Sequence, residues 1–577
     1  MLACLKRWVL AAALAAPLGL MAGAEGGSVV SPADPDPGAV TAKRDGVSVQ
    51  LPPSAFAAMQ TINPEHIRWH VKFLSHDLLE GRGTGQRGGD LAAEYMATQF
   101  AEYGLKPAGD NGSYLQKVPL VGVTTLPETR FALQPREGSQ PAMILKPLED
   151  YVAFDETQQP QSEVDAEIVY VGYGIEAPEY NWDDYKGADV HGKVLLMLVN
   201  EPPSEDPRFF KGKALTYYGR WTYKFEEAAR KGAVGVILIH REDMASYPWD
   251  VVRNSDAGEK SYLQLEGPAL KVASWVRAEV AEKLAAASGM DLNQMIAQAG
   301  KPEFHPMTLG VRLKAHMVSR IRNFQSNNVL AILPGSDRNL KDQAVLYTAH
   351  YDHLGIRPEM PGDNIYNGAA DNGTGCGILL EVARAFSVAR DRPGRSIIFA
   401  SVTAEEQGLL GSEYLGKHPP VPAAKIALDL NYDDVKPLGA PEEVEVTGAE
   451  RTTFYPWVQA TAKEFRLAIR PDARPEAGQF YRSDHFSLAR VGIPSFSINQ
   501  GMTFKGHDAA WGMAQEKEFV AKHYHQPSDE YRPEMDFVGD GAMARFGFAL
   551  GWEAASLPRL IGWQKGDEFE AARLKGQ

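Results

Sequence analysis

The chain has 577 residues, of which 44% are hydrophobic and 23% are charged, and its formal net charge is −15. This length and composition are typical of a globular protein with roughly two or three hydrophobic cores, and they exclude a mainly disordered chain. The negative charge argues against a nucleic acid as partner, because nucleic-acid binding needs clustered Lys and Arg.

The first 24 residues have the pattern of a secretory signal peptide. Lys6 and Arg7 precede an apolar stretch, which ends in the small residues "AGA" at 22–24. We therefore expect residues 1–24 to be removed, and the protein to be secreted or periplasmic with no membrane span after cleavage. Pro17 and the shortness of the apolar stretch argue against a membrane anchor.

The two cysteines are Cys4 and Cys376, and Cys4 lies within the predicted signal peptide. No disulfide within one mature chain is therefore expected, and the fold must rely on its own core. Cys376 stands among apolar residues in "GTGCGILL", which predicts a small buried side chain.

Composition divides the first half of the chain into three parts. Residues 25–62 are rich in Pro, Ala, Gly and Asp without periodicity, which predicts a flexible leader. In the next part, 63–159, apolar residues at helical spacing between Leu91 and Phe100 predict a helix. In residues 160–300, the strand-like runs "EIVYVGYG", "KVLLMLVN" and "AVGVILIH" alternate with the helical run "FEEAARKG", so we expect a small inserted α/β module.

Residues 301–577 contain a longer alternation of strands and helices. "AVLYTAH" (344–350), "SIIFASV" (396–402) and "KIALDLNYD" (425–433) indicate buried strands, separated by helical runs such as "GILLEVARAFSVA". This pattern predicts an α/β fold with a mostly parallel central sheet covered by helices on both faces. In such sheets, chemistry is expected at the ends of the strands.

Acidic residues and histidines follow the ends of these strands. The segments are "HYDH" (350–353), "GAADNGTG" (368–375), "TAEE" (403–406), the end of "LNYD" at 433, and "HYHQPSDEY" (523–531). Oxygen and imidazole ligands without thiolates suit zinc at a catalytic site, and a carboxylate can bridge two ions. The adjacent Glu405 and Glu406 would point in opposite directions from an extended backbone, so one could bind metal while the other handles a proton.

Together, "TAHYDHLG", "GAADNGTG", "TAEEQGLLGS", "LNYDD" and "HYHQPSDEY" resemble the co-catalytic (two-zinc) aminopeptidase family, the group that includes glutamate carboxypeptidase and glutaminyl cyclase. "LLEGRGTGQRGGDLAAEYMATQFAEYGLKPAG" and "FYRSDHF" (480–486) match the same family. The resemblance implies a fold of the zinc exopeptidase type, with 63–159 and 301–577 as the two parts of a catalytic metallopeptidase domain. Residues 160–300 resemble the protease-associated domain that is inserted in many of these enzymes. This module would either cover the active-site cleft and limit the size of the substrate, or have a structural role alone.

The resemblance also implies roles for individual residues. Glu405 would be the general base, and Asp352 would orient the imidazole of His350 from outside the metal shell. Two Zn²⁺ per chain would be bound, with Asp371 as the bridge between them. One ion would have the ligands His350, Asp371 and Asp433, and the other Asp371, Glu406 and His525.

Several neighbouring residues remain open to more than one interpretation. Asp429, two residues before the end of "NYD", competes with Asp433 as a ligand. His353 and His523 stand beside proposed ligands but off the family pattern, which favours supporting or surface roles. His485 is expected to be an orienting or structural residue. Substrate could contact Tyr481, Arg482 and Asp484.

The resemblance implies a zinc-dependent aminopeptidase that acts on peptides. A carboxypeptidase or dipeptidase on the same scaffold is the alternative, and would need a basic clamp for the substrate carboxylate, for which Arg482 is the nearby candidate. A receptor-like binding protein that has lost its metals is the non-enzyme alternative, and the intact ligand set argues against it. A glutaminyl cyclase is disfavoured, because its chemistry uses one zinc. The oligomeric state is not indicated by the sequence.

Overall fold

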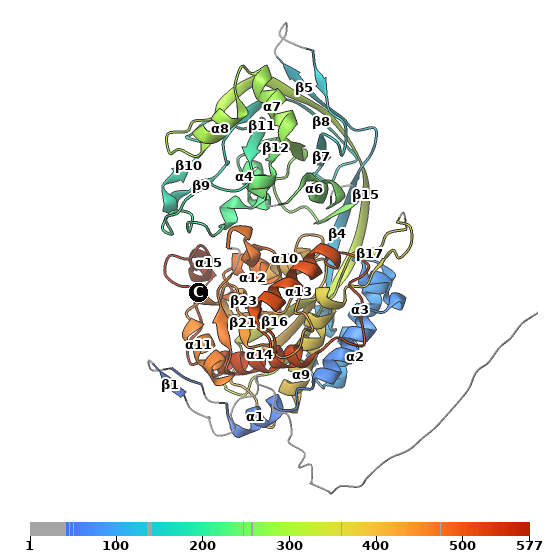
Figure 1. The fold of residues 1–577 in the computed structure, drawn as a ribbon, viewed down its shortest axis with the longest axis vertical. Coiled ribbons are helices and arrows are strands. Elements are labelled where there is room, and N and C mark those ends of the chain that lie inside the picture. Colours follow the sequence, from blue (N-terminus) through green and yellow to red (C-terminus); the bar gives the residue numbers. More distant parts are fainter. Residues whose placement is uncertain are drawn as a thin grey trace, which may run out of the picture.

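The computed structural model describes residues 42–44, 47–49, 51–135, 141–245, 247–255, 258–358, 360–472 and 475–576. The predicted signal peptide, residues 1–24, lies outside the described residues. The chain forms two lobes, which share the 27-residue strand β15 (Met307–Leu333) along one side (Figure 1). We call residues 51–125 and 319–576 the main lobe, and residues 130–318 the second lobe.

The main lobe is built on strands in the order β23-β20-β16-β19-β15. The first four are parallel to one another, and β15 pairs antiparallel with β19. All residues of β16 and β19 are buried, as expected for a parallel sheet covered on both faces. The bounds are β16 (Ala344–His350), β19 (Ser396–Val402), β20 (Ile426–Asn431) and β23 (Ser495–Ser497), with β3 (Lys106–Pro107) and β4 (Leu115–Thr125) also paired to β15.

Helices cover both faces of this sheet. Tyr347 of β16 belongs to the core cluster on the face of α9 and α14, whereas its neighbour Leu346 belongs to a separate cluster on the face of α10 and α12. This alternation follows from the two-residue period of a strand, and the predicted fold class is confirmed. The helices of the main lobe are α1 (Pro53–Met59), α2 (Pro64–Leu74), α3 (Arg87–Glu102), α9 (Gly375–Val388), α10 (Leu410–Lys417), α11 (Tyr455–Glu464), α12 (His485–Arg490), α13 (Ala509–Lys522), α14 (Val538–Ser556) and α15 (Glu570–Gly576).

The predicted leader, residues 25–62, is ordered at its C-terminal end. Residues 53–59 form α1, and the side chains of Ala55 and Met59 are fully buried in the main core. Composition predicted a flexible segment here, but apolar residues four positions apart share one face of a helix and bury it against α9 and α14. Residues 25–41 lie outside the described part of the chain.

The second lobe contains a sheet in the order β15-β8-β11-β12-β14-β7. Its sheet includes β5 and β7, which precede residue 160, and the first half of β15, which follows residue 300. The assignment of 160–300 to a protease-associated domain stays a prediction. The bounds are β5 (Arg130–Pro135), β7 (Tyr151–Phe154), β8 (Gln161–Tyr170), β11 (Val194–Leu198), β12 (Gly235–His240), β14 (Val272–Arg277), α4 (Trp221–Arg230), α7 (Ala278–Ala287) and α8 (Leu292–Ala299).

Short elements complete the two lobes. They are β1 (Ala42–Arg44), β2 (Val47–Val49), β6 (Met143–Ile144), β9 (Glu176–Ala177), β10 (Trp182–Asp183), β13 (Lys260–Leu263), β17 (Gly355–Ile356), β18 (Ile365–Tyr366), β21 (Glu443–Glu445), β22 (Ala468–Arg470), β24 (Asn499–Gln500), α5 (Glu242–Ala245) and α6 (Trp249–Ser255). Among the described helices, none combines the length and the apolar composition needed to cross a lipid bilayer.

The two lobes meet beside the loops of the main lobe that surround α12. The Leu215 amide donates to the Pro475 carbonyl oxygen over 3.0 Å, and Arg490 donates to the Glu226 carboxylate over 3.0 Å. Aromatic rings add an apolar contact, with the centroids of Tyr217 and Phe486 5.0 Å apart. Figure 1 shows this edge of the second lobe next to α12 and α15.

Candidate active site

The predicted site residues gather at one edge of the main sheet. His350 is the last residue of β16, Glu405 and Glu406 follow β19, and Asp433 follows β20. Because these strands are parallel, their C-terminal ends lie at the same edge, where ligands bind in open α/β sheets. Asp371 joins them from the helical turn η5 (Ala369–Thr374), which leads into α9.

A first group of candidate ligands surrounds His350. The donor atoms of His350, Asp371 and Asp433 all lie within 4.8 Å of one another. The Nε2 atom of His350 is 3.1 Å from Oδ1 of Asp433 and 3.3 Å from Oδ1 of Asp371. On the other side of the ring, Nδ1 lies 3.2 Å from the carbonyl oxygen of Asp352, which fixes the orientation of the imidazole.

A second group uses the other oxygen of Asp371. Nε2 of His525 lies 3.3 Å from Oδ2 of Asp371 and 3.1 Å from Oε2 of Glu406. Donor atoms of His353, Asp371 and Glu406 also lie within 4.8 Å of one another. Nδ1 of His353 is 2.5 Å from Oε1 of Glu406, so this histidine, expected only to support the site, is in direct contact with a candidate ligand.

The electrostatics of both groups are those of a site that attracts cations. Burial works to lower the pKa of His350, but the carboxylates of Asp433 and Glu405 raise it well above its usual value. Burial likewise opposes ionisation of Glu406, yet the facing His525 and His353 lower its pKa to about 2. The clustered carboxylates therefore favour positive charge at this site, either from the imidazoles themselves or from a bound cation.

Glu405 differs from its neighbour Glu406. Its Oε2 lies 3.9 Å from Nε2 of His350, farther than the carboxylates of the first group. Burial raises its pKa well above the usual value for a glutamate, and the negative charge of Asp433 adds to this effect. A carboxyl with a raised pKa is a stronger proton acceptor than an ordinary glutamate.

Hydrogen bonds from other loops hold the ligands in place. Asp529 accepts hydrogen bonds from the backbone amides of Ala370 and Asp371, each over 3.0 Å. Asp352 accepts from the Glu405 amide over 3.1 Å. Sequence reasoning missed Asp529, although it lies in the quoted segment "HYHQPSDEY", where an acidic residue four positions after His525 was the available signal.

Two hydroxyls complete this support. The second oxygen of Asp352 accepts from the Thr84 hydroxyl over 3.0 Å, and Oδ2 of Asp433 accepts from the Ser483 hydroxyl over 2.5 Å. Both carboxylates are therefore held from two sides, one by the N-terminal segment and the other by the loop before α12.

A buried arginine lies behind the site. Arg82 is fully buried, and its guanidinium donates to four backbone carbonyl oxygens, at 2.5–2.8 Å: those of Leu74, Tyr351, Asn367 and Gly368. These carbonyls belong to three separate segments, so Arg82 joins the loops that carry His350 and Asp371. Arg82 lies in the segment "LLEGRGTG", which matches the family, but its role could not be deduced there because its partners are up to 286 residues away.

Asp429 and Asp433 lie in different surroundings. Asp429 is fully buried within β20, where one carboxylate oxygen accepts from the Thr348 hydroxyl over 3.1 Å. Burial raises its pKa well above the usual value. Its other oxygen has no hydrogen-bond partner in the described part of the chain. Asp433, two residues farther on, is the one in contact with His350.

The three residues expected to contact substrate are not in one place. The Tyr481 hydroxyl donates to Glu568 over 2.7 Å, and the ring is buried. Asp484 is fully buried, and burial raises its pKa to about 7. Arg482 lines a cavity between the lobes. Their roles in binding substrate stay predictions.

The remaining sequence predictions concern residues beside the site. His485 is buried, with its ring packed against Phe480 at a centroid distance of 4.8 Å. His523 is half-buried, and its Nδ1 lies 3.0 Å from the Ser528 hydroxyl. The prediction of a buried Cys376 is confirmed, and its thiol donates to the carbonyl oxygen of His350 over 3.1 Å.

Comparison with known proteins confirms the resemblance for the site-bearing segment, since residues 328–543 match the model of Peptidase family M28. The chain is 29% identical over 211 residues to Aminopeptidase YwaD of Bacillus subtilis (strain 168), covering 36% of this chain and 40% of that protein. It is 28% identical over 249 residues to Leupeptin-inactivating enzyme 1 of Streptomyces exfoliatus, covering 42% of this chain and 51% of that protein. The chain thus spans about half or less of the length of these curated relatives.

Among solved structures, the fold is similar to that of an aminopeptidase from Aneurinibacillus sp. strain AM-1, with a TM-score of 0.50 and 18% identity. The match covers 88% of this chain and 97% of that chain, and therefore includes both lobes. At this identity the likeness is one of fold.

Proposed function

We propose that this protein is a zinc-dependent aminopeptidase that removes N-terminal residues from peptides and holds two Zn²⁺ per chain. One observation carries the proposal: two groups of imidazole and carboxylate donors share Asp371 at the C-terminal edge of a parallel sheet. The match of residues 328–543 to a peptidase family supports the reaction class. The similarity to proteins named as aminopeptidases supports the type of substrate.

The donor atoms fit zinc. A tetrahedral zinc with ligand bonds of about 2.0–2.2 Å separates its ligand atoms by about 3.4 Å. The distances from His350 to Asp371 and Asp433, and from His525 to Asp371 and Glu406, are 3.1–3.3 Å. Three protein ligands for each ion would leave one coordination position open, as in catalytic rather than structural sites.

The distances between donor atoms also distinguish metal ligands from supporting residues. The 2.5 Å between Nδ1 of His353 and Oε1 of Glu406 is a short direct contact, and leaves no room for an ion between those two atoms. We therefore assign His525 as the ligand and His353 as the residue that fixes one oxygen of Glu406. The proposed ligand sets are His350, Asp371 and Asp433 for one ion, and Asp371, Glu406 and His525 for the other.

The reaction would depend on proton transfer by Glu405. Bound zinc ions would lower the pKa of water and polarise the scissile carbonyl group. Glu405, whose pKa is raised by burial, would accept a proton from the attacking water and pass it to the departing amine. The carboxylate of Asp352 would hold Glu405 by accepting a hydrogen bond from the Glu405 backbone amide. The carbonyl oxygen of Asp352 would hold the imidazole of His350.

The proposed location of the protein rests on its sequence alone. The pattern of residues 1–24 supports secretion or a periplasmic location, and predicts a mature chain that begins at Glu25. N-terminal sequencing of the protein exported by its host tests this. Recovery of a chain that begins at Met1 from the cell interior would contradict it.

Blocked substrates test the proposed activity. We expect the protein loaded with zinc to hydrolyse leucine p-nitroanilide, and to leave N-acetyl-leucine p-nitroanilide uncleaved, because the free α-amine is recognised at the metal centre. An N-blocked dipeptide with a free carboxylate tests the carboxypeptidase alternative. Cleavage of that dipeptide alone would favour the alternative, and no cleavage of any substrate would contradict the peptidase proposal.

A further inference from the structure

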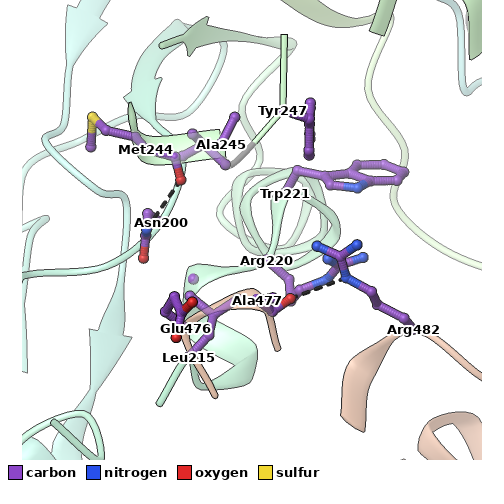
Figure 2. A pocket seen from close by; sticks show the side chains of 12 residues that line it. Asn200, Leu215, Arg220, Trp221, Met244, Ala245, Tyr247, Glu476, Ala477 and Arg482 are labelled. Atoms are coloured by element: carbon purple, nitrogen blue, oxygen red, sulfur yellow. Dashed lines mark hydrogen bonds between the residues drawn. The ribbon is translucent and has the colours of Figure 1, made fainter. Parts of the chain in front are cut away.

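A small cavity lies between the two lobes, apart from the candidate metal ligands. Its walls come from the start of α4, the residues after β11 and the C-terminal end of α5 in the second lobe, and from Glu476, Ala477 and Arg482 in the main lobe (Figure 2). Its volume is about 30 Å³. One water needs at least about 10–15 Å³ by this measure, so the cavity can hold about two waters or one small polyatomic ion, and no amino-acid side chain.

Each lobe contributes one arginine to this cavity. Arg220 immediately precedes α4, and Arg482 follows the helical turn Gln479–Tyr481. The positive charge of Arg482 acts on the Arg220 guanidinium, and Figure 2 draws the two groups next to one another. Nε of Arg482 donates to the Ala477 carbonyl oxygen over 3.0 Å. The Arg220 guanidinium has neither a hydrogen bond nor an ion pair with any described residue.

Neither guanidinium pairs with a carboxylate of the described residues, and Arg220 is partly buried whereas Arg482 is exposed to solvent. Burial, together with the positive charge of Arg482, lowers the pKa of the Arg220 guanidinium to about 10, so it remains charged at neutral pH. Glu476 also lines the cavity, but it forms no ion pair with either arginine among the described residues. In Figure 2, its carboxylate lies apart from the two guanidinium groups. A partly buried guanidinium with five donors ordinarily has an acceptor, and here none is supplied by the described chain.

We propose that this cavity binds one small monovalent anion of the carboxylate class, held between Arg220 and Arg482 across the boundary of the lobes. The planar guanidinium group of an arginine matches the two oxygens of a carboxylate. These oxygens can accept hydrogen bonds from the arginines of both lobes. The small volume favours a carboxylate group over a bulky anion. The source is either a free ion such as acetate or the terminal carboxylate of a peptide that reaches in.

Occupancy of this site would affect the main lobe at one defined point. Arg482 is followed by Ser483, whose hydroxyl donates to Asp433. An anion bound to both arginines would offset the repulsion between their positive charges. It would also hold the second lobe against the loop that contains Ser483, which supports the carboxylate of Asp433. The inference depends neither on bound zinc nor on hydrolysis, so it can fail or succeed independently of the proposed function.

Thermal unfolding of the full chain in sodium acetate tests the site. Ionic strength is kept constant with the sodium salt of 2-(N-morpholino)ethanesulfonic acid, whose anion is too large for the cavity. We expect Tm of the wild type to rise with acetate concentration, because a ligand that binds the folded state alone stabilises it. Arg220→Gln and Arg482→Gln should each weaken acetate binding about tenfold or more, as expected for loss of a charged hydrogen-bond donor.

A matched control separates the site from general charge effects. Arg208→Gln also removes one positive charge from the second lobe, but Arg208 is exposed and pairs only with Asp206 in the described chain. This variant should respond to acetate as the wild type does. Each variant is compared with its own Tm without acetate, so a loss of stability cannot imitate a loss of binding. An equal acetate response in all four proteins would overturn the proposal.

Peptides distinguish the two sources of the anion. N-acetyl-glycyl-glycine and its C-terminal amide differ only in the carboxylate, and their blocked amines prevent aminopeptidase cleavage. A shift in Tm with acetate but not with the peptide acid assigns the site to free ions. A shift with the peptide acid that is absent with its amide assigns it to peptide carboxylates. Equal shifts with the acid and the amide, and none with acetate, would refute the anion site.

Discussion

Asp529 offers the sharpest test of how the site is held together. Its two carboxylate oxygens accept hydrogen bonds from the amides of Ala370 and Asp371, each over 3.0 Å. Asp529→Asn keeps one acceptor and turns an NH₂ group towards the other amide. The loss of one charge-assisted hydrogen bond costs about 1.5–3 kcal/mol. If that energy holds Asp371 in position, zinc affinity should fall roughly 10- to 100-fold, the range seen when supporting residues of metal sites are changed.

Competition with a chromophoric chelator measures this effect. Because Asp371 contributes one oxygen to each group of donors, Asp529→Asn should weaken both zinc ions. Glu530→Gln is the matched control, since it removes the same charge from the adjacent, exposed position and should leave zinc binding unchanged. The reasoning is refuted if Asp529→Asn binds zinc as tightly as the wild type, or if Glu530→Gln weakens zinc to the same extent.

Three further predictions follow from the geometry. Glu405→Gln should keep two zinc ions per chain while kcat falls by about 10²–10⁴, as for loss of a general base; loss of zinc in this variant would mean that the roles of the adjacent glutamates are exchanged. Asp433→Asn should lose one zinc ion on dialysis and Asp429→Asn none, as measured by metal analysis, and the opposite result would move the ligand by two residues. Arg82→Met should lower the free energy of unfolding in urea by about 3–5 kcal/mol, because four buried carbonyls lose their donor. The exposed Arg87→Gln should change it by less than about 1 kcal/mol, and equal effects of the two changes would contradict this role for Arg82.

The sequence predicted the centre of the fold well because local patterns determine it. The apolar runs at 344–350 and 396–402 coincide with β16 and β19, since a strand buried on both faces is a continuous run of β-branched and aliphatic residues. The residues that follow these strands meet at one edge because the strands are parallel. This geometry brought His350, Glu406 and Asp433 together without any knowledge of long-range contacts.

The parts that the sequence could not predict depend on contacts between distant segments. Arg82 and Asp529 lie in segments that match the family, but the backbone groups they contact, 286 and 158 residues away, cannot be deduced from those segments. The 27-residue β15 crosses both lobes, so no break in composition marks where one lobe ends. Arg220 and Arg482 become neighbours only when the lobes pack together.

Zinc titration of metal-free protein, followed by hydrolysis of leucine p-nitroanilide, tests the central proposal most directly. The two groups of donors that share Asp371 predict that activity rises until two equivalents of zinc per chain have been added, and then stays constant. Full activity at one equivalent would show that a single ion is sufficient. No activity at any zinc concentration, with the protein folded, would contradict the proposed enzyme.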